Sequence, residues 1–465
     1  MMLIDETIAS LANKLKKKEI SPVDIAKECL KQIEKQNPKI NAFITQVDSK
    51  AVLDQAKKIK LTTPLSGIPY VLKDVYVTKD LRTTAASNVL SDYIPQYDAT
   101  VVHKVNSAGS ILLGKMNMDA WGHGGSTENT DFGPAKNPWD ITRVAGGSGG
   151  GPAAAIVSRM CSFAIGEDTG GSIRNPAGWC GITGLKVTYG RVSRYGSIAY
   201  ASSFDSVGPT AKTAEDCALI LQHIAGQDPH DATSSPLPVG DYLSRLEEGI
   251  QGKVIGVPKE FMGEGLDPKV KKLILVAAQK FTDLGAKIEE VSLPTSKYAI
   301  SVYYLLAPSE TSSNLARYDG IRYGNGRDKF TPETMRRIMI GTYALSAGYY
   351  DAYYKKAQQA RTLIIKDYQK VFTKCDLILS PISPTPPTKL GELINDPVKN
   401  MLADIYTVTT NTAGIPALAL PCGFTRSGLP IGMQLQGPMF SEEVLLQAGY
   451  AYQQVTDWHV RKPQL

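Results

Sequence analysis

The chain has 465 residues, of which 43% are hydrophobic and 21% are charged, a composition typical of a globular protein and not of a disordered one. Its formal charge of +6 is small for this length, so charge gives no indication of direct nucleic-acid binding. None of the six cysteines belongs to a C-x-x-C pair, which argues against a zinc site or a redox dithiol and favours reduced, buried thiols. We therefore expect no metal site.

The N-terminal ten residues carry Asp5 and Glu6 before any basic cluster, which fits neither a secretory signal nor a transit peptide. No apolar run reaches the length that a membrane span requires. We therefore expect a protein without a membrane segment in a bacterial cytoplasm or an organelle matrix.

Near the N-terminus, Ser21 and Pro22 are typical of a helix start, and Pro38 is expected to end that helix. The short apolar run at residues 70–72 predicts a strand, which places Lys73 at its end.

Helices and strands are expected to alternate through the rest of the chain. Helices are predicted at residues 101–107, 152–156 and 268–284, and strands at residues 110–113, 162–165, 254–257 and 287–291. Residues 334–371 contain no proline and form the longest helical candidate. This alternation predicts an α/β protein with helices flanking a largely buried sheet. We find no repeat and no low-complexity linker, so we expect a single domain over residues 1–465.

Two glycine-rich segments, residues 146–151 and 166–174, each place a serine directly after a glycine pair, at Ser148 and Ser172. Glycine has no Cβ, so backbone N–H groups can crowd around one small polar centre, as acyl transfer requires. One such segment alone would favour a phosphate-binding loop or a simple turn. Two of them, with Lys73 upstream, favour serine-based acyl transfer.

A serine nucleophile needs a base, and the five histidines do not lie in a nucleophile-elbow or protease-like context. A lysine in an apolar setting is the alternative, because burial removes the solvation of its charged form and leaves an amine that can accept a proton. Lys73 has that setting. Taken alone, it could also be a lysine at a strand end that reaches water.

With these residues, the chain resembles the amidase signature family. The matching segments are residues 67–74 (GIPYVLKD), 146–148 (GGS), 168–174 (DTGGSIR) and 180–186 (CGITGLK). The resemblance implies the amidase-signature fold, in which a large mixed β-sheet is flanked by helices on both sides.

The family uses a Ser–cis-Ser–Lys triad, and its roles can be carried over by motif. The resemblance implies that Ser172 is the nucleophile, that Ser148, preceded by a cis peptide bond, is the bridging serine, and that Lys73 is the base. The implied oxyanion hole consists of N–H groups from the loop before the nucleophile, at Thr169, Gly170 and Gly171.

Within the family, the resemblance is strongest to the glutamine-hydrolysing subunits of tRNA-dependent amidotransferases. It covers residues 20–457 and includes segments 126–129, 136–140, 189–196, 201–205 and 348–356. It implies that ammonia released from glutamine converts Glu-tRNA(Gln), or Asp-tRNA(Asn), to the amide. It also implies a heterotrimer with the B and C subunits, in which the misacylated tRNA, ATP and Mg²⁺ are bound by the B subunit, while this chain carries no cofactor.

Free glutamine carries an α-carboxylate and an α-ammonium, so a selective pocket should offer one fixed cation and one fixed anion. Arg337 and Asp404 match the family positions for these roles, and Arg336 is a close competitor for the first. The alternative is that these residues are surface charges on helices.

The sequence departs from the family pattern at five positions around the serine motifs. Gly149 stands where a second serine is usual, Ala145 replaces a proline, and Pro152 follows the glycines. Glu167 stands where Ser or Thr is commoner, and Val75 where Asn is commoner. Because the triad is intact, we expect activity.

Two other functions stay open at this point. One is a free-standing amidase acting on aryl or small aliphatic amides, which would need neither partners nor the Arg337 and Asp404 pair. The other is a catalytically weak scaffold that holds the B and C subunits together.

Overall fold

The computed structural model describes residues 2–318, 320 and 322–465. Its strands are β1 (Phe43–Gln46), β2 (Pro69–Lys73), β3 (Ile111–Met116), β4 (Lys136–Asn137), β5 (Asp140–Val144), β6 (Phe163–Asp168), β7 (Thr183–Lys186), β8 (Ser206–Ala211), β9 (Val254–Pro258), β10 (Lys287–Val291), β11 (Leu377–Pro381), β12 (Ala417–Phe424) and β13 (Pro430–Gln436). Its α-helices are α1 (Ile8–Lys16), α2 (Pro22–Ile40), α3 (Ser49–Lys58), α4 (Thr100–Ser107), α5 (Gly150–Val157), α6 (Arg174–Cys180), α7 (Ala214–Ile224), α8 (Pro268–Asp283), α9 (Ala299–Asn314), α10 (Pro332–Leu345), α11 (Lys356–Val371), α12 (Pro397–Leu402), α13 (Val408–Ala413) and α14 (Glu442–Gln454).

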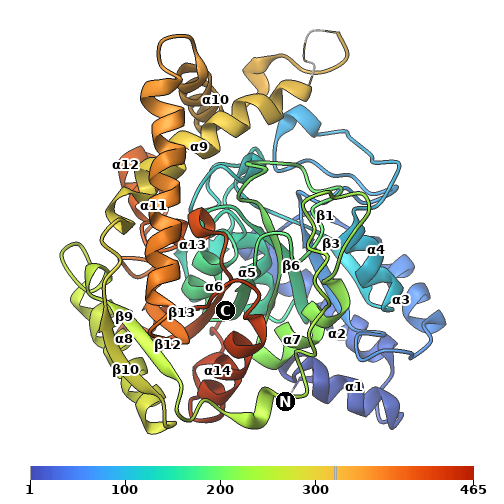
Figure 1. The fold of residues 1–465 in the computed structure, drawn as a ribbon. Helices are drawn as coiled ribbons and strands as arrows, with labels where there is room; N and C mark the ends of the chain where they lie inside the picture. The colour runs from blue at the N-terminus through green and yellow to red at the C-terminus, as the bar shows by residue number, and fades with distance from the viewer. Residues whose placement is uncertain (1, 319, 321) are drawn as a thin grey trace.

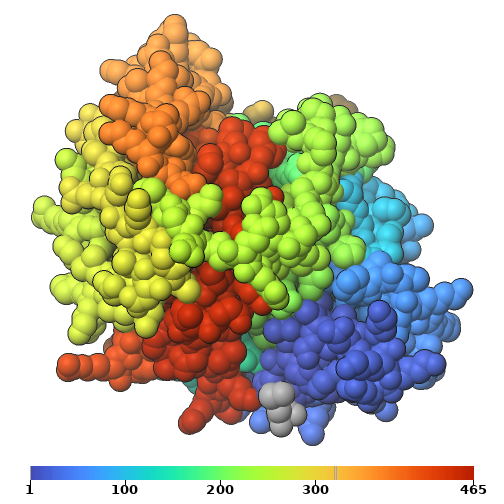
Figure 2. Space-filling model, turned by 60° about the horizontal axis from the view of Figure 1, so that its bottom comes forward, coloured from blue at the N-terminus to red at the C-terminus, as the bar shows by residue number. Residues whose placement is uncertain are grey.

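Within the described residues, eleven strands form one sheet in the order β1-β3-β2-β6-β8-β7-β12-β13-β11-β9-β10. The sheet is mixed: it contains parallel pairs, such as β2 with β3 and β9 with β10, and antiparallel pairs, such as β6 with β8 and β12 with β13. The C-terminal strands β12 and β13 lie between the N-terminal strands and β9–β11. Figure 2 shows the same arrangement on the surface, where the C-terminal part separates the N-terminal part from the yellow segment.

Helices cover both faces of the centre of this sheet (Figure 1). On one face, Gly184 of β7 approaches Ala177 of α6 so closely that a Cβ would lie 2.9 Å from the alanine Cβ. On the other face, Gly449 of α14 packs against Leu418 of β12. Leu418 precedes Ala419, the register partner of Gly184, and successive strand residues face opposite sides. The expected mixed sheet with helices on both sides is therefore confirmed.

Most predicted elements lie within a few residues of their expected positions. The first predicted helix, α2, starts at Pro22 as expected but continues past Pro38 to Ile40, where Asn41 in the left-handed conformation ends it. The prediction of one long helix over residues 334–371 was wrong.

Instead, α10 ends at Leu345, and α11 begins at Lys356 after a π-helical turn at Asp351–Lys355. Gly348 has φ +85° in this connection. A residue in the left-handed region interrupts a helix as a proline would, so the absence of proline did not predict continuity.

All six cysteines are buried and free, as their spacing predicted. None of the described helices is both long enough and apolar enough to cross a membrane.

Candidate functional site

Lys73 and Ser148 meet in the interior of the protein. Lys73 is the last residue of β2 and is fully buried, and its Nζ lies 2.8 Å from the Oγ of Ser148. The peptide bond between Gly147 and Ser148 is cis, as the family resemblance implied. The alternative that Lys73 is a strand-end lysine reaching water is therefore wrong.

The two serine-bearing segments touch through their backbones. Ser172 follows β6 in the short loop before α6 and is 7% exposed. Its carbonyl oxygen accepts a hydrogen bond of 3.2 Å from the N–H of Gly149, the residue after Ser148. A Cβ on Gly149 would lie 2.6 Å from that carbonyl oxygen. Glycine at this departure from the family pattern thus permits the close contact between the two segments.

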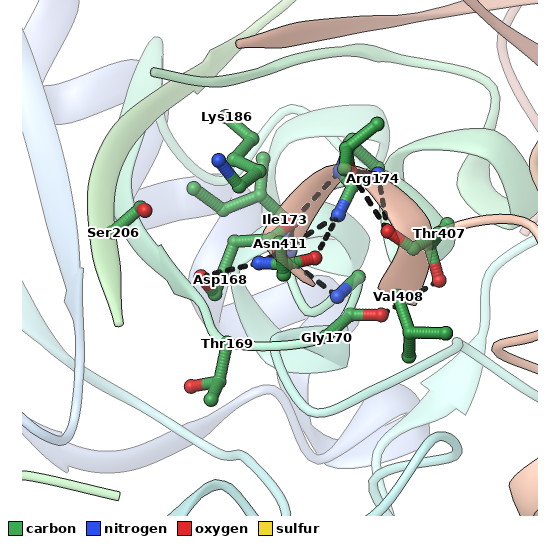
Figure 3. A network of polar contacts seen from close by, with 12 residues as sticks. Asp168, Thr169, Gly170, Ile173, Arg174, Lys186, Ser206, Thr407, Val408 and Asn411 are labelled. Carbon is green, nitrogen blue, oxygen red and sulfur yellow. Dashed lines mark hydrogen bonds and ion pairs between the residues drawn. The ribbon is translucent and has the colours of Figure 1, made fainter. Parts of the chain in front are cut away.

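A buried ionic network holds the loop that carries Ser172 (Figure 3). The Asp168 carboxylate accepts hydrogen bonds from the N–H groups of Gly171, at 2.8 Å, and Ile173, at 3.1 Å. It also pairs with the Arg174 guanidinium at 3.0 Å and accepts a bond from the Asn411 amide. Burial acts to raise the pKa of Asp168, but the charge and hydrogen bonds of Arg174 outweigh it and hold the pKa below its usual range. The carboxylate therefore stays charged and fixes the loop.

The N–H groups of this loop differ in their availability. That of Gly171 is engaged by Asp168, although the sequence predicted it as an oxyanion donor. The Gly170 carbonyl is held by the Thr407 hydroxyl at 2.6 Å. Among the described residues, the N–H groups of Thr169, Gly170 and Ser172 have no hydrogen-bond acceptor. These groups can receive a new acceptor without breaking a bond.

The structure brings Arg337 and Asp404 to the same residue, Tyr304. The Arg337 guanidinium lies 5.2 Å from the ring centroid, and the Tyr304 hydroxyl lies 3.4 Å from the Asp404 carboxylate. Arg337 donates to Glu333 at 2.9 Å and to the Tyr200 hydroxyl at 2.5 Å. Burial raises the pKa of Asp404 to about 7, against the opposing effect of Arg337. Both side chains are buried, so the alternative of surface charges is wrong for this pair.

Arg336 also pairs with Glu333, but it lines a cavity of about 240 Å³ that Arg337 does not line. Its side chain is 39% exposed. The cavity is also lined by Asp119, whose backbone N–H donates to the Ser148 carbonyl at 3.1 Å. Burial raises the pKa of Asp119 to about 7, although N–H groups that bond its carboxylate act to lower it. Arg336 and Arg337 therefore have different surroundings.

The sequence did not predict a role for two carboxyl groups near Lys73. Glu167 Oε2 lies 2.7 Å from Lys73 Nζ, and Asp205 is linked to Glu167 through the Thr169 hydroxyl. For Glu167, one indication was present in the sequence, because the family more often has Ser or Thr at this position. For Asp205 the only signal was its place in a segment that matches the family.

Comparison with known proteins gave concordant results. A family model described as Amidase matches residues 24–446. The glutamyl-tRNA(Gln) amidotransferase A subunit of Desulfatibacillum aliphaticivorans is 49% identical, and the match covers 100% of both chains. The solved A subunit of the Thermotoga maritima enzyme superposes with a TM-score of 0.87 at 39% identity, over 99% of this chain and 97% of that one. A bacterial aryl acylamidase superposes equally well, with a TM-score of 0.87 over 99% of both chains, but at 26% identity.

Proposed function

The chain belongs to the amidase family, and we propose that it is the glutamine-hydrolysing subunit of a tRNA-dependent amidotransferase. The observation that carries this proposal is the buried contact between Lys73 Nζ and Ser148 Oγ, on a segment that touches the loop of Ser172. Identity of 49% over the full length to a subunit of that kind, against 26% to an aryl acylamidase, selects the substrate class.

In the proposed reaction, the neutral amine of Lys73 removes the proton of the Ser148 hydroxyl. Ser148 in turn takes the proton of Ser172 as the Ser172 oxygen attacks the side-chain amide carbon of glutamine. The relay returns a proton to the leaving nitrogen, the C–N bond breaks, and ammonia departs. Water then hydrolyses the acyl-enzyme to glutamate.

The oxyanion of the tetrahedral intermediate needs fixed donors. We assign this role to the N–H groups of Thr169, Gly170 and Ser172, which have no acceptor among the described residues. The N–H of Gly171 could join them only by leaving Asp168.

For glutamine selection, we propose that Arg337 binds the α-carboxylate and Asp404 the α-ammonium. The proposal is supported by their burial beside the same tyrosine. A charge-assisted hydrogen bond is strong in a buried site. A simple amide has neither an α-carboxylate nor an α-ammonium, so it cannot form these bonds.

We further propose that the partners are the B and C subunits of the amidotransferase, and that misacylated tRNA, ATP and Mg²⁺ are bound mainly by the B subunit. The complex works in a bacterial cytoplasm or an organelle matrix. The central position of β12 and β13 between the two halves of the sheet supports one domain over residues 1–465.

The test is glutamate release by the co-purified complex with misacylated tRNA and ATP, comparing wild type with Ser172→Ala. We expect release that rises with tRNA and is lost in the variant. Cleavage of simple amides without any glutamine hydrolysis would indicate a free-standing amidase instead. Inactivity toward both substrates would indicate a scaffold.

A further inference from the structure

The amine of Lys73 has three neighbours within hydrogen-bond distance. They are Ser148 Oγ at 2.8 Å, the Glu167 carbonyl oxygen at 3.0 Å and Glu167 Oε2 at 2.7 Å. A neutral amine has two N–H groups and one lone pair. If both N–H groups donate to Glu167, the lone pair is left for the proton of Ser148. Glu167 therefore orients Lys73 as a base, and its carboxylate is the counter-charge once Lys73 becomes an ammonium.

The second oxygen of Glu167 belongs to a chain of three side chains. Glu167 Oε1 is in hydrogen-bond contact with Thr169 Oγ1, and the same hydroxyl lies 2.7 Å from Asp205 Oδ1. A threonine hydroxyl has one hydrogen to donate, whereas two ionised carboxylates would both require one. Both contacts are satisfied only if one carboxyl group is protonated and donates to Thr169. The chain thus holds one proton.

The surrounding groups place that proton on Asp205. Burial, and then the negative charge of Glu167, raise the pKa of Asp205 to about 8, although its hydrogen bonds with the Thr169 hydroxyl and the Ala201 N–H, and then the charge of Arg194, act to lower it. Glu167, by contrast, accepts N–H hydrogen bonds from the Lys73 amine in direct contact, and such bonds favour an ionised carboxylate. The remaining titratable group that faces the pair is Tyr76, whose hydroxyl donates to the Gly166 carbonyl at 2.6 Å.

We propose that Glu167 is a positioning residue for Lys73, and that the chain Glu167–Thr169–Asp205 stores one proton and thereby sets the pH range in which the triad works. The proposal rests on the proposed function, because Lys73 must be the base of the reaction. With Asp205 protonated, one negative charge lies beside Lys73. When Asp205 ionises, a second charge arises, the Thr169 hydroxyl can satisfy only one carboxylate, and Lys73 is held more firmly as an ammonium.

The experiment follows the nucleophile directly and needs neither tRNA nor partner subunits. The rate of sulfonylation of Ser172 by phenylmethanesulfonyl fluoride is measured in the full-length chain between about pH 5 and pH 10. Peptide mass spectrometry identifies the modified residue. In Glu167→Gln we expect the acidic limb of the rate profile to move to lower pH by about 1–3 units, and the maximal rate to fall.

Asp205→Asn should keep the acidic limb near its wild-type position and abolish the change in rate around pH 8 that Asp205 ionisation produces. Asp216→Asn is the matched control. Asp216 is also a buried carboxyl group with a raised pKa, but it accepts a hydrogen bond from the N–H of Ile8 and has no contact with the Lys73 side chain. Its profile should follow wild type. If Glu167→Gln does not fold by circular dichroism, Glu167→Ser gives the same directional test.

The proposal would be overturned if the rate of sulfonylation in the Glu167 variant had the same pH dependence as in wild type and differed only by a constant factor. A merely structural role lowers the rate equally at every pH. If wild type itself is not labelled at Ser172, the proposed function fails, and this inference fails with it. Labelling of Ser172 with an unmoved profile leaves the proposed function intact and removes only the inference.

Discussion

The proposed chemical end of the site, at Lys73, Ser148 and Ser172, and its proposed recognition end, at Arg337 and Asp404, are built differently. Lys73, Ser148 and Ser172 lie at strand ends and in short loops in the middle of the sheet, where a network centred on Asp168 fixes the backbone. Arg337 lies on α10, which packs against α9 and projects from the sheet (Figure 1).

This difference separates two requirements. The chemistry demands atoms placed to within a fraction of an ångström, which a sheet centre supplies. Recognition of free glutamine demands two opposite charges at a set spacing, which a helix and a turn supply here: Arg337 lies on α10, and Asp404 lies between α12 and α13. Damage to the first region should therefore lower kcat for any amide, whereas damage to the second should raise KM for glutamine alone.

We expect the largest change in kcat from substituting Lys73, and a second buried lysine, Lys212, provides the control. Lys73→Met should lower kcat by about 10²–10⁴-fold on glutamine and on a simple amide, because it removes the proton acceptor. Lys212→Met is the control, since Lys212 is also buried but donates to the Ile4 carbonyl far from the serines. It should affect stability and leave kcat unchanged. Equal kcat losses in the two variants would contradict the role of Lys73.

The role proposed for Arg337 can be tested against its neighbour Arg336, which serves as the matched control. Arg337→Lys should raise KM for glutamine by about 10–100-fold, because a lysine cannot reproduce the fork that bonds Glu333 and Tyr200 while binding a carboxylate. Arg336→Lys should change it by less than about threefold, since an exposed ion pair contributes little. Steady-state kinetics with glutamine and a simple amide decide the matter. The reverse ranking would assign the α-carboxylate to Arg336.

How much of this could be predicted from the sequence differs between the two ends. Lys73, Ser148 and Ser172 could be singled out from the sequence, because two glycine-serine motifs and a lysine after an apolar strand mark them and the family resemblance implies their roles. Arg337 could be separated from Arg336 only in the structure, because adjacent helix positions point in directions about 100° apart. The proximity of Glu167 to Asp205 was also inaccessible, since a fold and not a motif brings them together.

The ionisation of Asp404 offers a smaller effect with a defined sign. In the proposed role, the Asp404 carboxylate would bind the α-ammonium only when charged, and burial raises its pKa to about 7. The charged fraction falls as pH drops through 7, so KM for glutamine should rise as pH falls from 8 and level off at about the tenfold increase expected of Asp404→Asn. Asp404→Asn should raise KM about tenfold at pH 8 and remove this dependence. A pH-dependent KM that persists in Asp404→Asn would assign the titration to another group, such as Asp119.

The smallest effect concerns the contact between the two serine segments. Gly149→Ala places a Cβ 2.6 Å from the Ser172 carbonyl oxygen, so the loop that carries Ser172 must shift. We expect a loss of about 1–3 kcal/mol in the free energy of unfolding and a fall of several-fold in kcat with KM for glutamine unchanged. Gly263→Ala is the control, because a Cβ there meets no atom within 4 Å. A change in KM without a change in kcat would show that the chemical and recognition ends are coupled through this contact, because a disturbance confined to the serines cannot alter how Arg337 and Asp404 hold glutamine.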